Sequence, residues 1–469
     1  MTTIIRRGTV VTATDSFAAD VLIEGETITA IGVDLSVDAD TVIDAEGCLV
    51  LPGLIDNHTH LDMPFADTKT ADDFATGTAA AAAGGTTCIV DFARQLDGSL
   101  ERGLAVWREK AEDKAHIDYA FHLTVTDASA GALREVARVA ADGVTSFKLF
   151  MAYRGALMID DRDMLAVLEA VGEVGGLCLV HAENGDAVEH NIAKALAVGH
   201  VDPKFHATTR PPVVEQEATA RAIRLAQVVG QPLFVVHVTC RESLREVEYA
   251  REMGLPVAGE TCTHYLVLTA DELARPGFEG AKYVCSPPLR KKSDQEALWL
   301  ALRHRALGIV SSDHCPFNFA GQKEMGRGDF SRIPNGMPGI ESRLPLLFTH
   351  GVRGGRITVN ELVSLAATEP ARIFGLAPKK GSLVPGADAD IVVFDPDREH
   401  VITATSSHGA ADYTPFEGFV CLGAPRRVLS RGETVFENGE IVSDPGRGRY
   451  VPRSPCGQAV AGERMHADV

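Results

Sequence analysis

The stretch Leu51-Pro52-Gly53-Leu54-Ile55-Asp56-Asn57-His58-Thr59-His60-Leu61-Asp62 contains the pattern on which the interpretation of this chain depends. It predicts a short apolar strand that ends in two histidines. Side chains alternate between the two faces of a strand, so His58 and His60 are expected to point the same way. Two imidazoles on one side of a strand can bind a single metal ion. An isolated His-x-His pair is more often two unrelated histidines, so the rest of the chain has to decide.

Downstream of this stretch, short apolar runs alternate with helical patterns. The runs are Gly53–His60, Thr87–Phe92, Tyr119–Val125, Ser146–Met151, Leu177–His181, Leu233–Thr239, Val257–Tyr265 and Gly308–Asp313. The helical patterns between them include Asp72–Ala83, Leu100–Lys114, Ala132–Ala141, Asp161–Gly172, Glu215–Val229 and Glu242–Glu252. Eight buried strands that alternate with helices predict an α/β protein with a parallel (β/α)8 barrel of the TIM type. A doubly wound sheet is the alternative, because periodicity alone does not exclude it.

The two ends of the chain share a different pattern, with short alternating segments separated by turn signals. Residues 1–52 and 376–445 are rich in such segments, for example Ala389–Phe394. Chain termini often lie close together, so both ends are expected to form one small β-sandwich domain beside a catalytic barrel at residues 53–375. Residues 446–469 are rich in Gly, Pro, Arg and Ser, and they predict a tail that contacts a neighbouring subunit.

Composition excludes several classes of function. The chain has 469 residues, 45% of them hydrophobic, and a formal net charge of −19, which disfavours nucleic acid as a partner. The first residues show no signal peptide, and no apolar stretch is long enough to predict a membrane span. The nine cysteines are scattered without the spacing of a disulfide framework or a zinc knuckle. A reducing cytoplasm is therefore the expected compartment.

Further potential metal ligands lie at the ends of the predicted strands. The fourth run contains Lys148, and the fifth, sixth and eighth end near His181, His237 and Asp313. The carboxyl ends of barrel strands are where barrel enzymes build their active sites. Alone, His181 or His237 is more often a core histidine with a backbone partner. Their joint appearance at strand ends predicts a metal centre.

Lys148 is the most unusual of these residues, because lysine is rarely buried without a partner. It lies in the apolar run Thr145-Ser146-Phe147-Lys148-Leu149-Phe150-Met151. One interpretation is a lysine at a strand edge whose stem reaches solvent. The other is a lysine neutralised by its surroundings, which can add carbon dioxide and bridge two metal ions as a carbamate. Beside the histidines, the second interpretation is favoured.

Motifs along nearly the whole chain resemble those of the amidohydrolase superfamily, in particular its dihydropyrimidinases and D-hydantoinases. They are Gly53–His60, Met63-Pro64-Phe65, Ala71–Phe74, Gly84–Thr87, Lys148–Tyr153, His181–Gly185, Arg210-Pro211-Pro212, His237–Cys240, Gly259–Cys262, Ser286–Arg290, Ser312–Cys315 and Pro334–Glu341. The His-x-His motif is common to the superfamily. The stretches Ser286-Pro287-Pro288-Leu289-Arg290 and Asn335-Gly336-Met337-Pro338-Gly339-Ile340-Glu341 are far more specific to this branch.

The resemblance implies a centre of two zinc ions per subunit. One ion would be held by His58, His60 and Asp313, and the other by His181 and His237. N6-carboxylated Lys148 would bridge both ions. Imidazole and carboxylate ligands suit zinc, which is the default ion of such two-metal hydrolases.

The resemblance also implies the reaction, which opens a cyclic amide to an N-carbamoyl amino acid. A hydroxide that bridges the metals would attack the ring carbonyl, and Asp313 would act as general base and then as general acid. Tyr153 would donate a hydrogen bond to the oxyanion. Backbone groups of Ser286 and Asn335 would bind the amide edge of the ring. From the residues alone, these last three would be a loop tyrosine, a turn serine and an Asn-Gly turn.

The substrate expected from the resemblance is an uncharged ring, either a 5,6-dihydropyrimidine or a 5-substituted hydantoin. Dihydroorotases carry an arginine for the substrate carboxylate at the position of Asp62, whose charge would repel that carboxylate. Allantoinases remain an alternative, although they usually have an acidic-Pro-Gly turn where this chain has Met63-Pro64-Phe65. Phe65, Phe150 and Leu157 are candidates for an apolar pocket around a ring substituent, although each is as readily a packing residue.

A different class of function is represented by relatives of this fold that have lost metal ligands and serve as non-catalytic assembly or signalling proteins. Retention of all six expected ligands argues against that class here. The resemblance implies a homotetramer with a small-molecule substrate.

Overall fold

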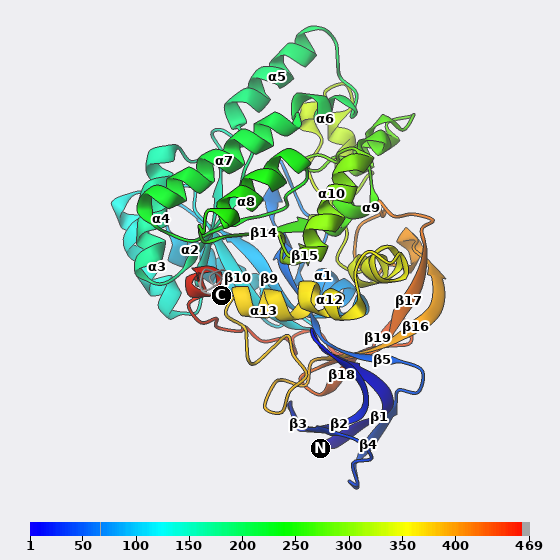
Figure 1. The fold of residues 1–469 in the computed structure, drawn as a ribbon. Coiled ribbons are helices and arrows are strands. Elements are labelled where there is room, and N and C mark those ends of the chain that lie inside the picture. Colours follow the sequence, from blue (N-terminus) through cyan, green and yellow to red (C-terminus); the bar gives the residue numbers. More distant parts are fainter. Residues whose placement is uncertain (66, 462–469) are drawn as a thin grey trace.

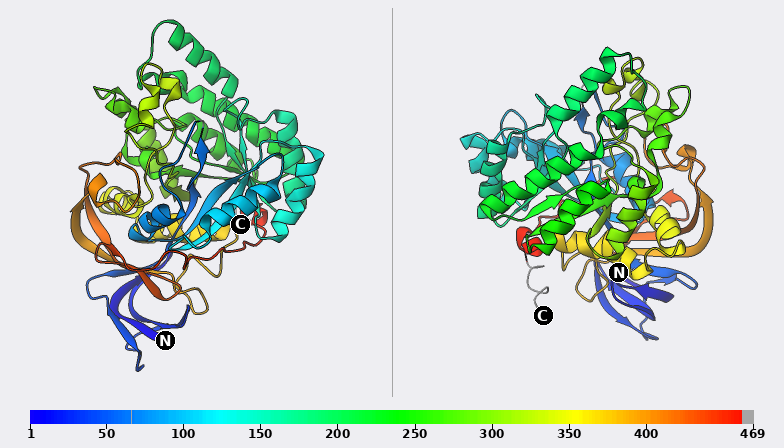
Figure 2. Two further views of the ribbon diagram at one scale, coloured as in Figure 1. Left: turned by 180° about the vertical axis from the view of Figure 1, so that it is seen from behind. Right: turned by 45° about the horizontal axis from the view of Figure 1, so that its top comes forward.

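The computed structural model describes residues 1–65 and 67–461, which form a barrel with a curved sheet attached to it (Figure 1). The barrel has eight parallel strands, and the sheet takes its strands from both ends of the chain, so the predicted fold class is confirmed. The strands from the two ends lie side by side, as Figure 2 shows from behind. Among the described residues, no helix combines the length and the apolar character needed to cross a membrane.

The barrel strands follow one another around the barrel in chain order. They are β6 (Leu54–Thr59), β9 (Thr86–Arg94), β10 (Asp118–Thr124), β11 (Ser146–Phe150), β12 (Leu177–His181), β13 (Leu233–Val235), β14 (Val257–Cys262) and β15 (Ile309–Ser311). Nearly every residue in them is buried, as expected for strands covered on both faces. The barrel closes where the chain beyond β15 meets β6, through hydrogen bonds from His60 N to His314 O (2.9 Å) and from His314 N to His58 O (3.3 Å).

Helices cover the outside of the barrel. They are α1 (Phe74–Ala83), α2 (Leu100–Ala111), α3 (Ala130–Ala141), α4 (Asp161–Glu173), α5 (Gly185–Ala197), α6 (Phe205–Thr209), α7 (Pro212–Val229), α8 (Arg241–Glu252), α9 (Thr263–Val267), α10 (Lys292–Arg303), α11 (Arg343–Leu346), α12 (Val359–Val363) and α13 (Glu369–Ile373). The six predicted helical patterns correspond to α1 to α4, α7 and α8. No sequence pattern predicted α5, α6, α9, α10 or the helices between residues 343 and 373.

The attached sheet is mostly antiparallel. Its strands are β1 (Thr2–Val11), β2 (Ser16–Glu24), β3 (Thr27–Gly32), β4 (Thr41–Asp44), β5 (Leu49–Pro52), β16 (Ile391–Val401), β17 (Val420–Ser430), β18 (Glu433–Glu437) and β19 (Glu440–Ile441). The two ends of the chain join where β5 pairs with β16. The chain passes from this sheet into the barrel at Gly53, where a Cβ atom would lie 2.1 Å from Thr87 Oγ1, so only glycine fits.

The segment after the sheet closes the lower end of the barrel. Tyr119 N donates to Arg449 O (3.0 Å), and Val451 N donates to Tyr119 O (2.8 Å). The buried guanidinium of Arg453 donates to Phe121 O and, at 2.8 Å, to Ser146 Oγ. Residues 446–461 thus pack on the barrel of their own chain. Their predicted contact with a neighbouring subunit stays a prediction, and residues 462–469 lie outside the described part.

A buried cluster of charges ties the barrel to the sheet. Lys380 Nζ donates to Asp118 Oδ2 (2.8 Å) on β10, to Asp388 Oδ2 (2.9 Å) and to Asp390 Oδ2 (2.8 Å). Burial lowers the pKa of Lys380, but the three carboxylates outweigh it and raise the pKa well above its usual value. The charged lysine therefore links the barrel to the attached sheet through these ion pairs.

Replacing Lys380 by methionine is expected to destabilise the protein by about 3 kcal/mol, because the three carboxylates lose the cation that they surround. The measurement is the unfolding midpoint in urea or on heating. Lys379→Met is the matched control, because its side chain is largely exposed and its Nζ lies 3.9 Å from Asp388. Equal midpoints for the two variants would contradict the structural role of Lys380.

Candidate metal centre and substrate pocket

All nine residues predicted for the site line a single pocket at the carboxyl ends of the barrel strands. The pocket has an empty volume of about 560 Å³, which includes open solvent at its mouth. The nine residues are His58, His60, Lys148, Tyr153, His181, His237, Ser286, Asp313 and Asn335. They come from seven different segments of the chain, so the pocket exists only in the folded barrel.

The first group consists of the two histidines of the opening motif and Asp313. Asp313 Oδ1 lies 3.2 Å from His58 Nε2 and 3.3 Å from His60 Nε2. Burial raises the pKa of Asp313, but the two histidines outweigh it and leave the pKa below its usual range. Burial lowers the pKa of His60 to about 4, so its imidazole is neutral at pH 7. A carboxylate and neutral imidazoles are the forms that bind a divalent metal.

The second group is the pair His181 and His237. His181 Nδ1 lies 2.9 Å from His237 Nε2, and both side chains are buried. Burial is the main cause that lowers both pKa values, so both rings are neutral at pH 7. Two neutral imidazole nitrogens that face each other this closely can turn toward one shared cation.

Lys148 lies on β11 within the same pocket and is 1% exposed. Its Nζ lies 4.8 Å from the ring centroid of Phe92 and 5.2 Å from that of Phe150. Among the described residues, it has no hydrogen-bond or ion-pair partner. Burial lowers the pKa of Lys148 to about 7, so a large share of the amine is neutral near neutral pH. The solvent-reaching lysine considered above does not fit this position.

Two glutamates fix the orientation of the histidine rings. Glu260 Oε1 lies 2.5 Å from His58 Nδ1, and Glu260 Oε2 accepts a hydrogen bond from Asn57 Nδ2. Glu183 Oε2 lies 3.0 Å from His181 Nε2 and 2.8 Å from Arg210. Such carboxylate partners select the tautomer that leaves the other ring nitrogen free for a metal. The sequence analysis missed both, although Glu260 lies in an apolar run just as Lys148 does.

The positions of the possible ligand atoms also support a metal centre, independently of the sequence patterns. His58, His60 and Asp313 each place one ligand atom within 4.8 Å of the others. His60 Nδ1 is buried without a hydrogen-bond partner among the described residues. Cys262 and His264 reach Asp313 with the same spacing, but burial raises the pKa of the Cys262 thiol well above its usual value, which disfavours the thiolate that a metal needs.

The backbone is strained at three of the predicted site residues. Tyr153 (φ 66°), His237 (φ 39°) and Asp313 (φ 46°) all occupy the left-handed region, which side chains other than glycine rarely adopt. Each such residue costs about 1 kcal/mol or more and persists only where the surrounding structure holds it in place. Nine other described non-glycine residues also have a positive φ, so strain accompanies the predicted site but does not identify it alone.

The three predicted substrate-binding residues meet on one side of the pocket. Asn335 Nδ2 lies 3.4 Å from Tyr153 Oη, and Ser286 Oγ lies 3.3 Å from His206 Nε2. Burial raises the pKa of Tyr153, which keeps its hydroxyl protonated and able to donate. The predicted apolar residues Phe65, Phe150 and Leu157 also line the pocket.

Asp62 does not act as the sequence analysis expected. Its carboxylate lies 2.7 Å from Lys69 Nζ and 3.7 Å from Lys110 Nζ, and it is not among the pocket-lining residues. Because its charge is paired, the predicted repulsion of a substrate carboxylate is wrong. The difference from dihydroorotases is then only that this position carries no cation for a substrate carboxylate. Arg94 does line the pocket, with its NH1 group bound to Pro64 O (3.0 Å).

Comparison with known proteins places the chain beside a defined group of enzymes. Residues 49–435 match the model of the amidohydrolase family. The chain is 50% identical to a D-hydantoinase of Geobacillus stearothermophilus, with 98% of each chain covered, and 52% identical to a D-hydantoinase of Streptomyces coelicolor, with 97% of this chain and 98% of the relative covered. The crystal structure of a dihydropyrimidinase from Brevibacillus agri superposes with a TM-score of 0.96 at 52% identity, with 97% and 99% of the two chains covered.

Proposed function

Because this chain belongs to the amidohydrolase family, we infer that it hydrolyses cyclic amides and opens their rings, as expected of a D-hydantoinase or dihydropyrimidinase. Its substrates are 5-substituted hydantoins and 5,6-dihydropyrimidines, and its products are N-carbamoyl amino acids. The observation that carries the inference is the convergence of four histidines, a buried lysine and an aspartate on one pocket.

The proposed metal centre contains two zinc ions. His58, His60 and Asp313 would hold one ion, His181 and His237 would hold the other, and carboxylated Lys148 would supply a ligand to both. When bound, the ions polarise the ring carbonyl and lower the pKa of a bound water molecule. The low pKa of Lys148 supports its carboxylation, because the neutral amine forms a bond to the carbon of carbon dioxide and releases one proton.

The side chains of the pocket handle the proton and the developing charge. Asp313 is ionised at neutral pH, so its carboxylate accepts the proton of the attacking water and then delivers it to the ring nitrogen that leaves. The protonated Tyr153 hydroxyl donates a hydrogen bond to the oxyanion. Backbone groups of Ser286 and Asn335 bind the amide edge of the ring and orient it for attack.

A ring-opening assay on metal-loaded protein tests the function. Dihydrouracil, a 5-aryl hydantoin, allantoin and dihydroorotate are offered side by side. Carbamoyl products from the first two and none from the others are the expected result. Opening of allantoin alone would replace the proposal with an allantoinase. Absence of both turnover and bound metal would point to a non-catalytic relative.

Replacing Glu260 by glutamine is expected to weaken metal binding by about 10-fold to 100-fold. Glutamine presents an N–H group either to Asn57 Nδ2 or to His58 Nδ1, and both of these atoms donate hydrogen bonds to Glu260. The measurement is the metal dissociation constant from a chelator competition. The matched control is Glu173→Gln at the exposed end of α4, where no change is expected. Unchanged affinity in Glu260→Gln would remove it as the partner of His58.

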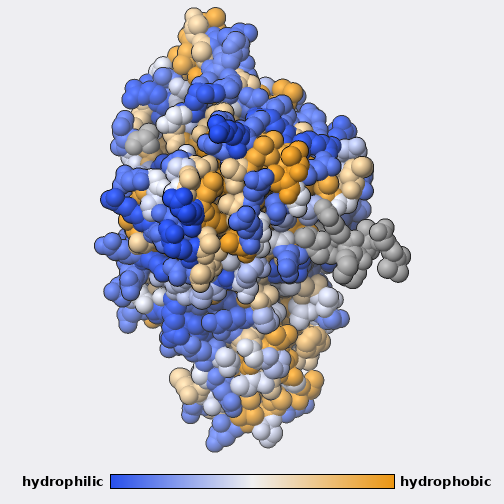
Figure 3. All heavy atoms as spheres, turned by 90° about the vertical axis from the view of Figure 1, so that its left-hand side faces the viewer, coloured by the Kyte–Doolittle hydropathy of each residue, from blue (hydrophilic) through white to orange (hydrophobic). Residues whose placement is uncertain are grey.

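A homotetramer is proposed from the family resemblance, and the surface offers some support. Exposed apolar side chains include Val213 and Val228 on α7, Tyr249 on α8 and Met253 directly after α8. Figure 3 shows apolar patches on an otherwise hydrophilic face. Large contiguous apolar patches mark protein–protein contact surfaces or other binding sites, whereas apolar side chains scattered singly are ordinary. Light scattering coupled to size exclusion measures the assembly.

A further inference from the structure

Two loops carry the residues proposed to bind the substrate ring, and they touch each other. The first follows η2 (Glu279–Tyr283) and contains Ser286, and the second follows η4 (Phe330–Arg332) and contains Asn335. Gly336 N donates a hydrogen bond to Val284 O at 3.0 Å. Among the described residues, this is the backbone hydrogen bond that joins the two loops. Side-chain hydrogen bonds must therefore help to fix the position of one loop relative to the other.

Lys323 supplies the other link. It begins η3 (Lys323–Gly326), is 0% exposed, and donates through Nζ to Pro334 O (2.6 Å), Gly336 O (2.7 Å) and Val284 O (2.8 Å). Burial lowers the pKa of Lys323 to about 7, and in the protonated form its three N–H bonds match the three carbonyl oxygens that accept them. Among the described residues, no carboxylate pairs with it. Its hydrogen-bonding capacity is therefore used entirely on the backbone of the two loops.

The accepting carbonyls lie next to the substrate-binding positions in the chain. Pro334 and Gly336 flank Asn335, and Val284 lies two residues before Ser286. A displacement of these carbonyls therefore moves the backbone groups of both residues. Without the cation, Pro334 O and Gly336 O would lose the hydrogen bond that each accepts, and Val284 O would keep only the bond from Gly336 N. The carbonyl oxygens that now converge would then be expected to separate.

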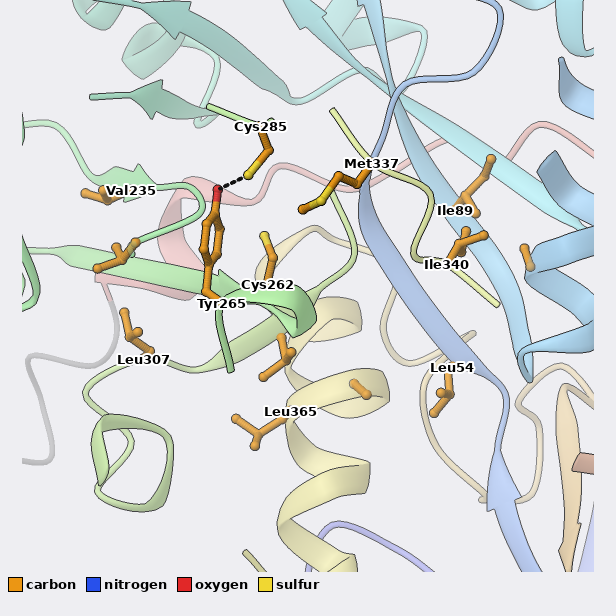
Figure 4. Close-up of a cluster of buried hydrophobic side chains, with 14 of the residues drawn as sticks. Leu54, Ile89, Val235, Cys262, Tyr265, Cys285, Leu307, Met337, Ile340 and Leu365 are labelled. Carbon is orange, nitrogen blue, oxygen red and sulfur yellow. Dashed lines mark hydrogen bonds between the residues drawn. The ribbon is translucent and has the colours of Figure 1, made fainter. Parts of the chain in front are cut away.

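The hydrophobic core contacts both loops. Figure 4 shows Cys285 and Met337, one from each loop, in the same cluster of buried side chains as Tyr265. Tyr265 Oη donates to Pro287 O at 2.6 Å, which anchors the first loop, but it makes no corresponding bond to the second. Tyr153 hydrogen-bonds the side chains of Ser286 and Asn335. Among the described residues, by contrast, Lys323 is the side chain that donates to backbone carbonyls of both loops.

We propose that Lys323 is a positioning residue for substrate binding, which holds the backbone of Ser286 and Asn335 at the separation that fits the amide edge of a six-membered or five-membered cyclic amide. The proposal rests on the proposed function, because it assigns to Lys323 the geometry of that same ring-binding site. It places no group of Lys323 in contact with the substrate or the metals.

The kinetic test compares Lys323→Met with the wild-type enzyme on dihydrouracil and on a 5-aryl hydantoin. Methionine keeps the length and the apolar stem but has no N–H group. We expect KM to rise about tenfold and kcat to change by less than about threefold, because the ring edge is bound alike in the ground state and the transition state. The metal content is expected to stay at the wild-type value. A fall in kcat with unchanged KM, or loss of metal, would overturn the proposal.

Lys380→Met is the matched control, since it also removes a buried lysine that binds three oxygens, but at the junction of barrel and sheet. It is expected to lower the unfolding midpoint without changing KM. An equal rise of KM in both variants would show a general loss of stability and would contradict a specific role for Lys323. Lys323→Gln, which keeps two N–H bonds, is the milder second variant and is expected to raise KM by about threefold.

Hydrogen exchange provides a readout that needs no activity. In Lys323→Met, the amide of Gly336, which donates to Val284 O, is expected to exchange at least about tenfold faster than in the wild type, while Lys380→Met leaves it unchanged. Unchanged exchange would contradict the proposal that Lys323 holds the two loops together. This result does not depend on turnover. If the wild-type enzyme opened no ring, the proposed function would be refuted, but hydrogen exchange would still show whether Lys323 holds the two loops together.

Discussion

Replacing Lys148 by alanine is expected to lower kcat/KM by at least about a thousandfold and to leave at most one metal ion in each chain. The amine is buried, and its pKa is lowered to about 7, so in the proposal it carries the carboxylate that bridges the two ions. Loss of the bridge removes several kcal/mol of charge stabilisation, and each 1.36 kcal/mol corresponds to a factor of ten in rate. Metal analysis and intact-protein mass, which registers one added carbon dioxide on the wild type, complete the measurement.

Lys148→Met separates the loss of the amine from the loss of packing. Methionine fills the space between the rings of Phe92 and Phe150 but cannot form a carbamate. It is expected to match Lys148→Ala in activity and metal content and to exceed it in stability. Two bound ions and full turnover in either variant would remove the carbamate from the mechanism.

Replacing Asp313 by asparagine is expected to lower kcat by about 10³-fold to 10⁴-fold while the protein stays folded. The carboxamide has the shape of the carboxylate but cannot accept and return a proton, which is the role proposed for Asp313. The measurements are kcat under saturating substrate, metal content and the melting temperature.

The matched control for Asp313→Asn is Asp73→Asn. Asp73 caps α1, and its carboxylate accepts hydrogen bonds from Ala75 N (2.8 Å) and Thr76 N (3.1 Å). Asparagine caps helices about as well as aspartate, so this variant is expected to behave as the wild type. An Asp313→Asn enzyme with near-normal kcat and metal content would take the general base away from Asp313.

The strands were predictable from sequence because each is a short apolar run buried on both faces. The helices that were missed give weaker patterns for opposite reasons. Only Gly185 and Val188 of α5 are fully buried, so its apolar stripe is too narrow to recognise. The helices from residue 343 onward are buried nearly all round, as in Leu344, Leu346 and Leu347, which removes the contrast between faces.

The predicted metal ligands share a simple signal, since each is a metal-binding residue type at or near a strand end. The ring-binding residues have no such signal and were recognised only through the resemblance. Ser286 and Asn335 lie on loops whose shape is set by contacts distant in sequence, including the bonds to Lys323. The residues next to Ser286 and Asn335 in the sequence carry no pattern that predicts such a contact, so it could not be predicted from one sequence.

The closing segment at Arg453 has a consequence for the order in which the molecule is made. A chain that emerges from the ribosome exposes β10 and β11 long before the guanidinium that binds Phe121 O and Ser146 Oγ has been synthesised. Likewise, β5 cannot form its antiparallel pairing with β16 until β16 has been synthesised. Such pairings between distant segments slow folding. The barrel therefore completes its lower end only once Arg453 has been synthesised, 307 residues after Ser146 of β11.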